Sequence, residues 1–372
     1  MNPSHKTINE LAELRDAIKR GTRIISLSGL TSIAAKSYIL SELQRETEKT
    51  FVIITATNKD LENWECDLDF FKDQSSKIKD QLILPSFETD VYSGISPHAE
   101  TQERRALALW NLVHEKPDFL VISAKSLITK TPSPDEIKNL GANLKLDEDF
   151  APEDLIERIT ACGYVREEPI KSVGEFSVRG GIVDVWSPTM ENPVRIEFFG
   201  DTVDSIREFD TETQLSINQI KEISIAPMRE FAASAKDFKD WTFFAKERFA
   251  DEKFSRNLKD RTDFASEGET FSGWEFLISL TNPRTASVFD FLQDCIFIID
   301  EPPFVEQTLE NYYEEIENHY EEITNHGEIG LEPEKLFVSG EDLRDKLNLK
   351  QRLELRALGK AAAETDEEFQ MI

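Results

Sequence analysis

The sequence contains few cysteines and no long apolar run. Cys66, Cys162 and Cys295 are far apart in the 372-residue chain, so neither a disulfide framework nor a CxxC zinc site is indicated. No stretch approaches the roughly 18–20 apolar residues that span a bilayer. The first residues, MNPSHKTINELAEL, contain no apolar core of a secretory signal. We therefore expect a cytoplasmic protein that does not enter a membrane.

The patterns of common catalytic and metal sites are also missing. The sequence has no HExxH spacing, no G-x-S-x-G elbow and no recognisable pairing of cysteine with histidine. We therefore predict no catalytic constellation, no bound metal and no cofactor. The five histidines are His5, His98, His114, His319 and His326.

Positive charge is scarce as well. The chain has 43 Lys and Arg against 72 Asp and Glu, which gives a formal net charge of −29. A field of this sign repels phosphate backbones, so autonomous, non-specific DNA binding is not expected. Between Val305 and Glu334 there are ten Glu and no Lys or Arg. We interpret this segment as a solvated acidic helix with a loop, the alternative being that it masks a basic partner surface.

The first 130 residues alternate between short apolar runs and helical patterns. Apolar runs typical of buried strands alternate with stretches whose apolar residues recur at helical spacing. This alternation predicts a parallel α/β sheet whose strands are buried on both faces. The expected strands are 23–27, 51–55, 82–84 and 119–123, and the expected helices are 7–20, 33–45, 58–71 and 99–114.

The pattern changes near Pro132 and returns after residue 290. The intervening part begins with an α+β module rich in strands and continues, over 229–290, with polar helical sequence containing aromatics. Cys295–Ile299 then reads as another buried strand, 336–338 as a strand leading into a helix, and 352–358 as a last strand. We predict one sheet that is completed after residue 290, with the module inserted into it.

The stretch from Gly174 to Asp210 carries the most informative pattern. Three β-type runs are separated by glycine and proline punctuation. In Val194–Phe199, alternation places Val194, Ile196 and Phe198 on a core face and Arg195, Glu197 and Phe199 on the other. An exposed aromatic beside an arginine suggests a protein-binding surface. The simpler interpretation is that another element covers Phe199 and that Arg195 is a solvated charge.

The loop SLSGLTS precedes a predicted helix in the manner of a phosphate-binding P-loop. Counted from Gly29, Ala34 replaces the second glycine, Ala35 the lysine and Lys36 the hydroxyl residue of G-x-x-x-x-G-K-[ST]. Asp300 and Glu301 close an apolar strand where Mg²⁺-binding and water-activating carboxylates would stand. We predict the shape of a nucleotide site without its chemistry, and the two carboxylates as vestigial.

Together these motifs resemble the N-terminal, UvrB-like region of the Mfd family of bacterial transcription-repair coupling factors. The resemblance extends over essentially the whole chain and is strongest for VRGGIVDVW with PVRIEFFGD. The segments that carry it, in order, are LSGLTS, SFETDVYSGISPHAETQERRALAL, GEFSVRGGIVDVWSP, NPVRIEFFGDTVDSIREFDTETQLS and IIDEP.

The resemblance implies a RecA-like fold that has lost ATPase activity. Residues 1–138 would be domain 1a, 139–228 an inserted UvrA-binding domain 2, and 229–372 domain 1b, which completes the RecA-like sheet. Matching the motifs residue by residue implies contacts with UvrA by Arg179, Arg195 and Phe199.

The resemblance also implies what this chain does not do. The aromatic β-hairpin with which UvrB grips DNA is expected to be absent, because the SFETDVYSGISPHAE passage is short. Full-length family members continue into an RNA-polymerase-binding domain and a DNA translocase, whose motifs do not appear here. We therefore expect an N-terminal fragment, contacting RNA polymerase and DNA only through regions absent from it.

The hypothesis that follows is a non-enzymatic adaptor that recruits excision repair to a stalled RNA polymerase by docking UvrA. A second hypothesis is that other domains of the full-length protein cover the same face, which would make this region an autoinhibitory clamp. The rival of a different class is a working UvrB-like, ATP-dependent module that binds damaged DNA.

Overall fold

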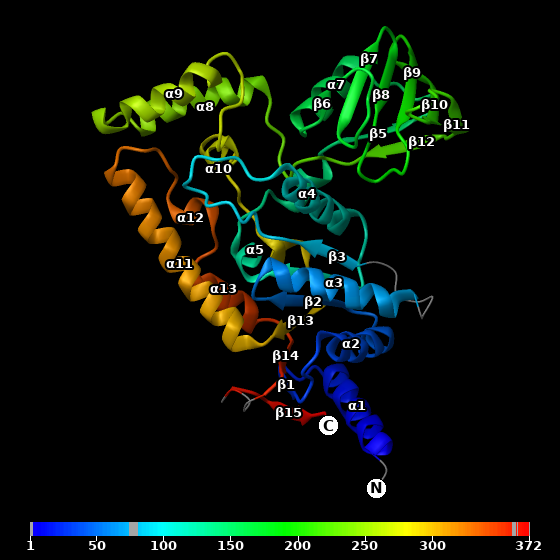
Figure 1. Ribbon diagram of the computed structural model, residues 1–372, viewed down its shortest axis with the longest axis vertical. Coiled ribbons are helices and arrows are strands. Elements are labelled where there is room, and N and C mark those ends of the chain that lie inside the picture. The colour runs from blue at the N-terminus through cyan, green and yellow to red at the C-terminus, as the bar shows by residue number, and fades with distance from the viewer. Residues whose placement is uncertain (1–2, 74–80, 359–361, 363, 372) are drawn as a thin grey trace.

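Two separate parts of the chain build one parallel sheet (Figure 1). The computed structural model describes residues 3–73, 81–358, 362 and 364–371. The strand that follows residue 290 pairs in parallel with an early strand on one side and a late strand on the other, which confirms the predicted completion of the sheet. Across the sheet the order is β15 (Glu367–Gln370), β1 (Ile24–Ser28), β14 (Arg352–Arg356), β13 (Cys295–Asp300), β2 (Thr50–Thr55), β4 (Phe119–Ser123) and β3 (Gln81–Leu84).

Helices cover both faces of this sheet. In β2 the side chains of Phe51 and Ile53 pack on one side, and those of Val52 and Ile54 on the other. Each such buried side chain contributes about 1.5–3 kcal/mol, so the central strands hold the two layers together. The first face is covered by α1 (Pro3–Arg20), α2 (Ile33–Thr47) and α3 (Asn58–Asp73), and the second by α4 (Ala99–His114), α5 (Ala124–Ile128), α11 (Pro302–Asn325) and α13 (Gly340–Asn348).

The inserted module forms a second, separate sheet, which Figure 1 shows set apart from the parallel one. Four strands, rather than the predicted three, lie between residues 174 and 210, because Gly200 (φ +62°) turns the chain back into an additional strand. The six-stranded sheet contains β11 (Ser216–Gln219), β10 (Thr202–Phe209), β9 (Val194–Phe199), β8 (Ile182–Val185), β7 (Glu175–Arg179) and β6 (Val165–Arg166), in that order. Beside it lie α7 (Pro152–Ala161) and the antiparallel pair β5 (Ala142–Lys145) and β12 (Glu222–Ile225).

Residues 229–290 are helical, as predicted. Their aromatic residues divide between core and surface: Trp241 and Trp274 are buried, whereas Phe243 and Phe244 are exposed. The helices are α8 (Ala235–Arg248), α9 (Ser255–Ala265) and the short α10 (Trp274–Leu277), joined by the 3-10 turns η1 (Glu252–Phe254), η2 (Ile278–Leu280) and η3 (Val288–Phe291). The remaining short helices are α6 (Pro134–Lys138) and α12 (Pro333–Leu336).

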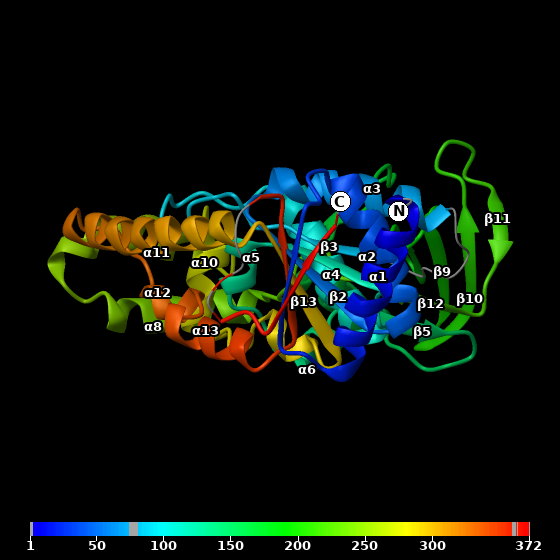
Figure 2. The same cartoon turned by 90° about the horizontal axis from the view of Figure 1, so that it is seen from below.

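Two elements differ from the sequence-based prediction. The expected strand at 336–338 is wrong. In this segment only Phe337 pairs, through an isolated bridge with Thr129. The reason is that the segment lies between α12 and the Ser339 cap of α13. Strand β15 was not predicted, since its sequence, EEFQ, has no apolar run. It pairs with β1 at the sheet edge and lies beside α1 (Figure 2).

The predicted acidic helix is present as α11, which runs along one side of the molecule (Figures 1 and 2). Its apolar side chains Val305, Leu309 and Ile316 are buried in the core, and the glutamates occupy its outer surface. None of the helices in the described part of the chain combines the length and apolar character that crossing a membrane demands.

A buried ion pair fixes the segment that leaves the inserted module. Arg105 of α4 is 0 % exposed, and its Nε atom donates to Oε2 of Glu230 at 2.8 Å. Its Nη1 atom donates to the Pro85 carbonyl at 2.7 Å and to the Ser126 hydroxyl at 2.6 Å. The chain leaving the module is therefore anchored to residues that follow β3 and β4.

Candidate docking face and nucleotide-type site

The alternation predicted for β9 is confirmed. Val194 and Ile196 are fully buried and Phe198 packs against the same core, whereas Arg195 lies on the opposite face. The Phe199 side chain is 84 % exposed. The interpretation in which another element covers Phe199 is therefore wrong.

The inner face of the smaller sheet is covered by its own helix. Leu155 and Ile159 of α7 are 0 % exposed and belong to one core cluster with the inward side chains of β8 and β9. This packing buries the apolar face of the sheet, so the outer face is the one that is exposed to solvent. That face is the candidate docking face, with side chains Arg179, Ile182, Asp184, Arg195, Glu197, Phe199 and Arg207.

A single carboxylate joins the two predicted arginines. Asp184 of β8 is 2 % exposed. Its Oδ1 atom accepts from Arg195 Nε at 2.7 Å, and its Oδ2 atom accepts from Arg195 Nη2 at 2.8 Å and from Arg179 Nη2 at 3.2 Å. The structure thus brings Arg179 and Arg195 together, through a residue that the sequence reasoning missed. The available signal was a lone acid within the apolar run IVDVW.

Further contacts, besides those with Asp184, restrain the Arg195 side chain. Its guanidinium lies over the Phe209 ring, 4.5 Å from the centroid, and its Nη2 atom also donates to Gln214 Oε1 at 3.0 Å. Hydrogen bonding to Asp184 raises the pKa of Arg195. The interpretation of Arg195 as a freely solvated charge is therefore wrong. Its aromatic neighbour is Phe209 rather than Phe199.

Phe199 lies at the end of the face nearest the Gly180–Gly181 turn. The Phe198 amide donates to the Gly181 carbonyl at 2.8 Å, which places the end of β9 against the turn that follows Arg179. The Arg179 side chain is 47 % exposed and also pairs with Glu168 at 3.4 Å. Arg179 and Phe199 therefore share one end of the sheet, and Arg195 lies farther along β9.

The residues predicted to form a nucleotide-type site also lie close together, at the ends of β1 and β13. Gly29 follows β1 with φ +96°, and a Cβ atom there would lie 2.0 Å from the Met371 carbonyl oxygen. The chain leaving β15 thus passes directly against the loop. At the start of α2, the Ser32 hydroxyl accepts from the Ala35 amide at 3.2 Å, and Ala34 is exposed. One donor of this helix end is therefore already bonded within the protein.

Lys36 forms the contacts that sequence reasoning missed here. Its Nζ atom donates to Asp300 Oδ1 at 2.6 Å and to Glu301 Oε1 at 2.8 Å, and its side chain is 4 % exposed. Trp64 Nε1 donates to the other Asp300 oxygen at 2.9 Å, and the Ala357 amide to Glu301 at 2.7 Å. Burial by itself lowers the pKa of Lys36, but the charges and hydrogen bonds of Asp300 and Glu301 raise it overall. The lysine therefore binds both Asp300 and Glu301 and offsets one of their two negative charges.

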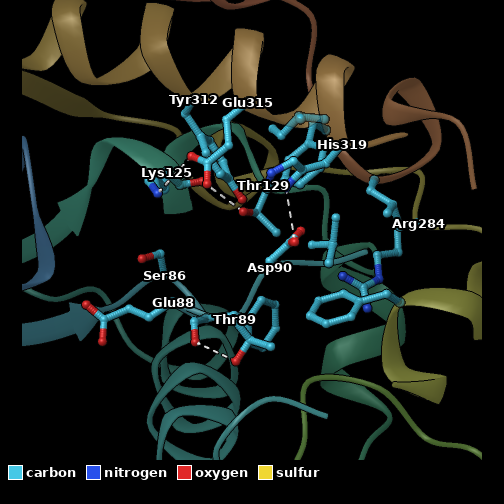
Figure 3. Close-up of a pocket in the computed structure, with 16 residues that line it drawn as sticks. Ser86, Glu88, Thr89, Asp90, Lys125, Thr129, Arg284, Tyr312, Glu315 and His319 are labelled. Carbon is cyan, nitrogen blue, oxygen red and sulfur yellow. Dashed lines mark hydrogen bonds and ion pairs between the residues drawn. The ribbon is translucent and has the colours of Figure 1, made fainter. Parts of the chain in front are cut away.

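A small cavity lies between the loop at residues 86–91 and α11 (Figure 3). Two polar contacts border it: His319 Nδ1 lies 3.1 Å from Asp90, and Lys125 Nζ lies 3.9 Å from Glu315. Its volume of about 90 Å³ is below the roughly 300–1,000 Å³ of typical ligand pockets. Within the described residues, no group of three or more His, Cys, Asp or Glu side chains is arranged to hold a metal ion.

Comparison with known proteins identifies the inserted module. Residues 142–231 match the UvrB interaction domain family. The match begins with β5 and ends just after Glu230, so it contains the whole smaller sheet and its anchoring residue.

Curated relatives match nearly the whole chain. The transcription-repair-coupling factor of Myxococcus xanthus is 29 % identical over 368 residues, covering 95 % of this chain and 30 % of the relative. That of Haemophilus influenzae is 25 % identical, covering 87 % and 28 %, and that of Bacillus subtilis is 28 % identical, covering 83 % and 27 %. The chain thus spans less than a third of the length of these relatives. Its residues 142–231 match the UvrB interaction domain family, and over most of its length the chain is similar to transcription-repair-coupling factors in a way consistent with their N-terminal region.

Proposed function

We propose that this chain is a non-catalytic adaptor that binds the repair protein UvrA through the docking face of its smaller sheet. As part of a longer coupling factor, it would bring excision repair to a stalled RNA polymerase. Contacts with RNA polymerase and with DNA would belong to other regions of that longer protein. The match of residues 142–231 to the UvrB interaction domain and the names of the relatives support this proposal.

The observation that carries the proposal is the exposure of Phe199. A phenylalanine that is 84 % exposed has no role in the core of its own sheet, and exposed aromatics flanked by arginines are typical anchors of protein interfaces. Arg179, at the same end of the sheet, is half-exposed, and Arg195 is held in a fixed position on the same face. The face therefore combines an apolar anchor with oriented cationic donors.

Replacing Phe199 by alanine is expected to weaken UvrA binding by about 2 kcal/mol or more, roughly 30-fold in Kd. The stability of the chain should hardly change, because the ring is exposed. Isothermal titration calorimetry of the purified chain with UvrA measures the effect. Arg179→Ala should weaken binding as well, since Arg179 is the more exposed of the two arginines.

The matched control is Phe243→Ala. Phe243 is also a largely exposed phenylalanine, at 67 %, but it lies on α8, outside the smaller sheet. This variant should bind UvrA as the wild type does. Unchanged affinity of both the Phe199 and the Arg179 variants would remove the docking face from the proposal.

We further propose that the parallel sheet is a degenerate RecA-like domain with no nucleotide turnover. The ion pairs of Lys36 and the passage of the chain after β15 against Gly29 support this proposal, because a working P-loop site would need the same residues free to receive phosphates and Mg²⁺. The loop 85–98 forms turns without strands, which favours the adaptor over a UvrB-like module that grips DNA with a hairpin.

A titration with Mg-ATP tests this second proposal. No saturable binding is expected in the millimolar range, because Lys36 is already bound to both carboxylates and the three groups together carry one net negative charge, which repels phosphates. Binding that the wild type shows and Lys36→Ala loses would reveal a working nucleotide site and overturn the proposed loss of ATPase chemistry. Fluorescence of a labelled ATP analogue, followed by competition with unlabelled ATP, provides the measurement.

A further inference from the structure

Asp184 occupies an unusual position for an acidic residue. It lies on the outer, water-facing side of the smaller sheet, yet its side chain is 2 % exposed. Two guanidinium groups cover it, those of Arg195 and Arg179. A carboxylate without water is stable only when hydrogen-bonded donors surround it. The two arginines therefore stabilise the buried carboxylate of Asp184, and Asp184 in turn restrains the two arginine side chains.

The geometry restrains Arg195 more tightly than Arg179. Asp184 receives both Nε and Nη2 of Arg195, at 2.7 and 2.8 Å, and such a bidentate pair fixes the plane of a guanidinium. The same guanidinium lies over the Phe209 ring. Among the described residues none accepts a hydrogen bond from Arg195 Nη1, so this edge remains free for an acceptor on another molecule.

The charges of the face also depend on Asp184. Arg207 forms an ion pair with Glu197 on neighbouring strands. Arg179 and Arg195 share Asp184, so this trio carries one net positive charge, and Glu168 lies at 3.4 Å from Arg179. The face therefore offers oriented donors more than a strong positive field. If the face recognises its partner through the orientation of these arginine donors, a group on the face must hold them in place.

We propose that Asp184 is the positioning residue of the docking face, which aligns Arg195 and Arg179 to receive carboxylate or carbonyl oxygens of the bound protein. This inference rests on the proposed UvrA-docking function. Asp184 itself is covered and does not touch the partner. It acts through Arg195 above all, because it holds two donor atoms of that side chain and one of Arg179.

The test is a double-mutant cycle with Asp184→Asn and Arg195→Ala in the full chain, with binding to UvrA measured by calorimetry. Asparagine keeps the size of the side chain but cannot accept from all three donor atoms as a carboxylate does. Each single variant is expected to weaken binding about tenfold or more. The loss in the double variant should be much smaller than the product of the two single losses, because Asp184 acts mainly through Arg195 and only the part that it exerts through Arg179 adds to the loss of Arg195→Ala.

A spectroscopic readout separates positioning from mere stability. The Nε–H resonance of Arg195 should exchange slowly with water in the wild type and quickly in Asp184→Asn. The charge-matched control is Glu157→Gln on α7, which covers the opposite face of the sheet, and it should leave both binding and this resonance unchanged. If Asp184→Asn does not fold, Arg195→Lys keeps the charge beside Asp184 without the planar fork and should still lose about tenfold in affinity.

The outcomes are distinct from those for the docking function itself. Wild-type affinity of Asp184→Asn or of Arg195→Lys, or losses that multiply in the double variant, would overturn the positioning role. If these results came together with weakened binding by Phe199→Ala, only the role of Asp184 would fail. Wild-type affinity of Phe199→Ala and Arg179→Ala would instead remove the docking function on which it rests.

Discussion

Arg105→Met is expected to lower the free energy of unfolding by about 3–5 kcal/mol, because it leaves a buried carboxylate without its main partner. Glu230 is 1 % exposed and receives Arg105 Nε at 2.8 Å, whereas Arg284 Nη1 is 3.8 Å from it. The variant also removes the donors to the Pro85 carbonyl and the Ser126 hydroxyl. Methionine fills much of the space but supplies none of these hydrogen bonds.

Urea denaturation followed by circular dichroism measures this effect, with Arg104→Met as the control. Arg104 is the preceding residue of α4, but its pair with Glu65 is about one-third exposed on both sides, and exposed pairs contribute about 0–1 kcal/mol. A loss below about 1 kcal/mol for Arg105→Met would show that the buried network contributes little to stability.

The position of Glu230 gives this prediction a functional meaning. Glu230 lies at the end of the segment that matches the UvrB interaction domain family, where the chain returns to the parallel sheet. Loosening it should raise hydrogen exchange first in the segments that enter and leave the module. UvrA binding by the folded variant should persist, because the docking face is built on β7–β10 and is stabilised by its own core.

Lys36→Met is expected to cost about 3 kcal/mol of stability. The substitution leaves Asp300 and Glu301 side by side near the end of β13 without their common cation, and a buried carboxylate left without its partner is strongly destabilising. The Trp64 indole still donates to Asp300, which limits the loss.

In the wild type the ion pair of Lys36 predicts how the stability of the fold depends on pH. The folded-state pKa of Lys36 is raised above its usual 10.5. The ion pair therefore stabilises the fold fully below the unfolded-state pKa and loses that contribution only as the pH rises through the higher folded-state pKa. Stability arising from Lys36 should hence be constant across neutral pH.

Lys49→Met provides the control for Lys36→Met. Lys49 pairs with Asp294 at 3.5 Å, but the aspartate is 68 % exposed, so less than about 1 kcal/mol should be lost. Thermal and urea unfolding of both variants at neutral pH provide the comparison. A Lys36 variant as stable as the wild type would mean that Asp300 and Glu301 are stabilised by hydration rather than by the lysine.

The elements of the parallel sheet were readable from the sequence because buried parallel strands are continuous apolar runs. The runs at 51–55 and 119–123 are β2 and β4. The two segments that were predicted wrongly do not follow this rule. Leu336–Val338 is apolar and buried but pairs through a single bridge, and β15 is polar but pairs fully with β1. Backbone pairing at an edge needs no side-chain pattern, so local sequence does not reveal it.

The sequence by itself determined two properties of the candidate sites. Alternation in β9 placed Arg195 and Phe199 opposite the core residues, because side chains of a strand point to alternate faces. The identities of Ala34 and Ala35 removed the glycine and lysine of a P-loop, because neither alanine can replace them at phosphates.

Only the tertiary structure decided the rest. It showed that nothing in the described chain covers Phe199, that Asp184 joins Arg179 to Arg195, and that Lys36 meets Asp300 across 264 positions of the sequence. Each of these facts depends on which strands are neighbours and which side chains fill the space between them. Spacing along a chain fixes the direction of a side chain, whereas its partners are set by packing between segments that are distant in the sequence.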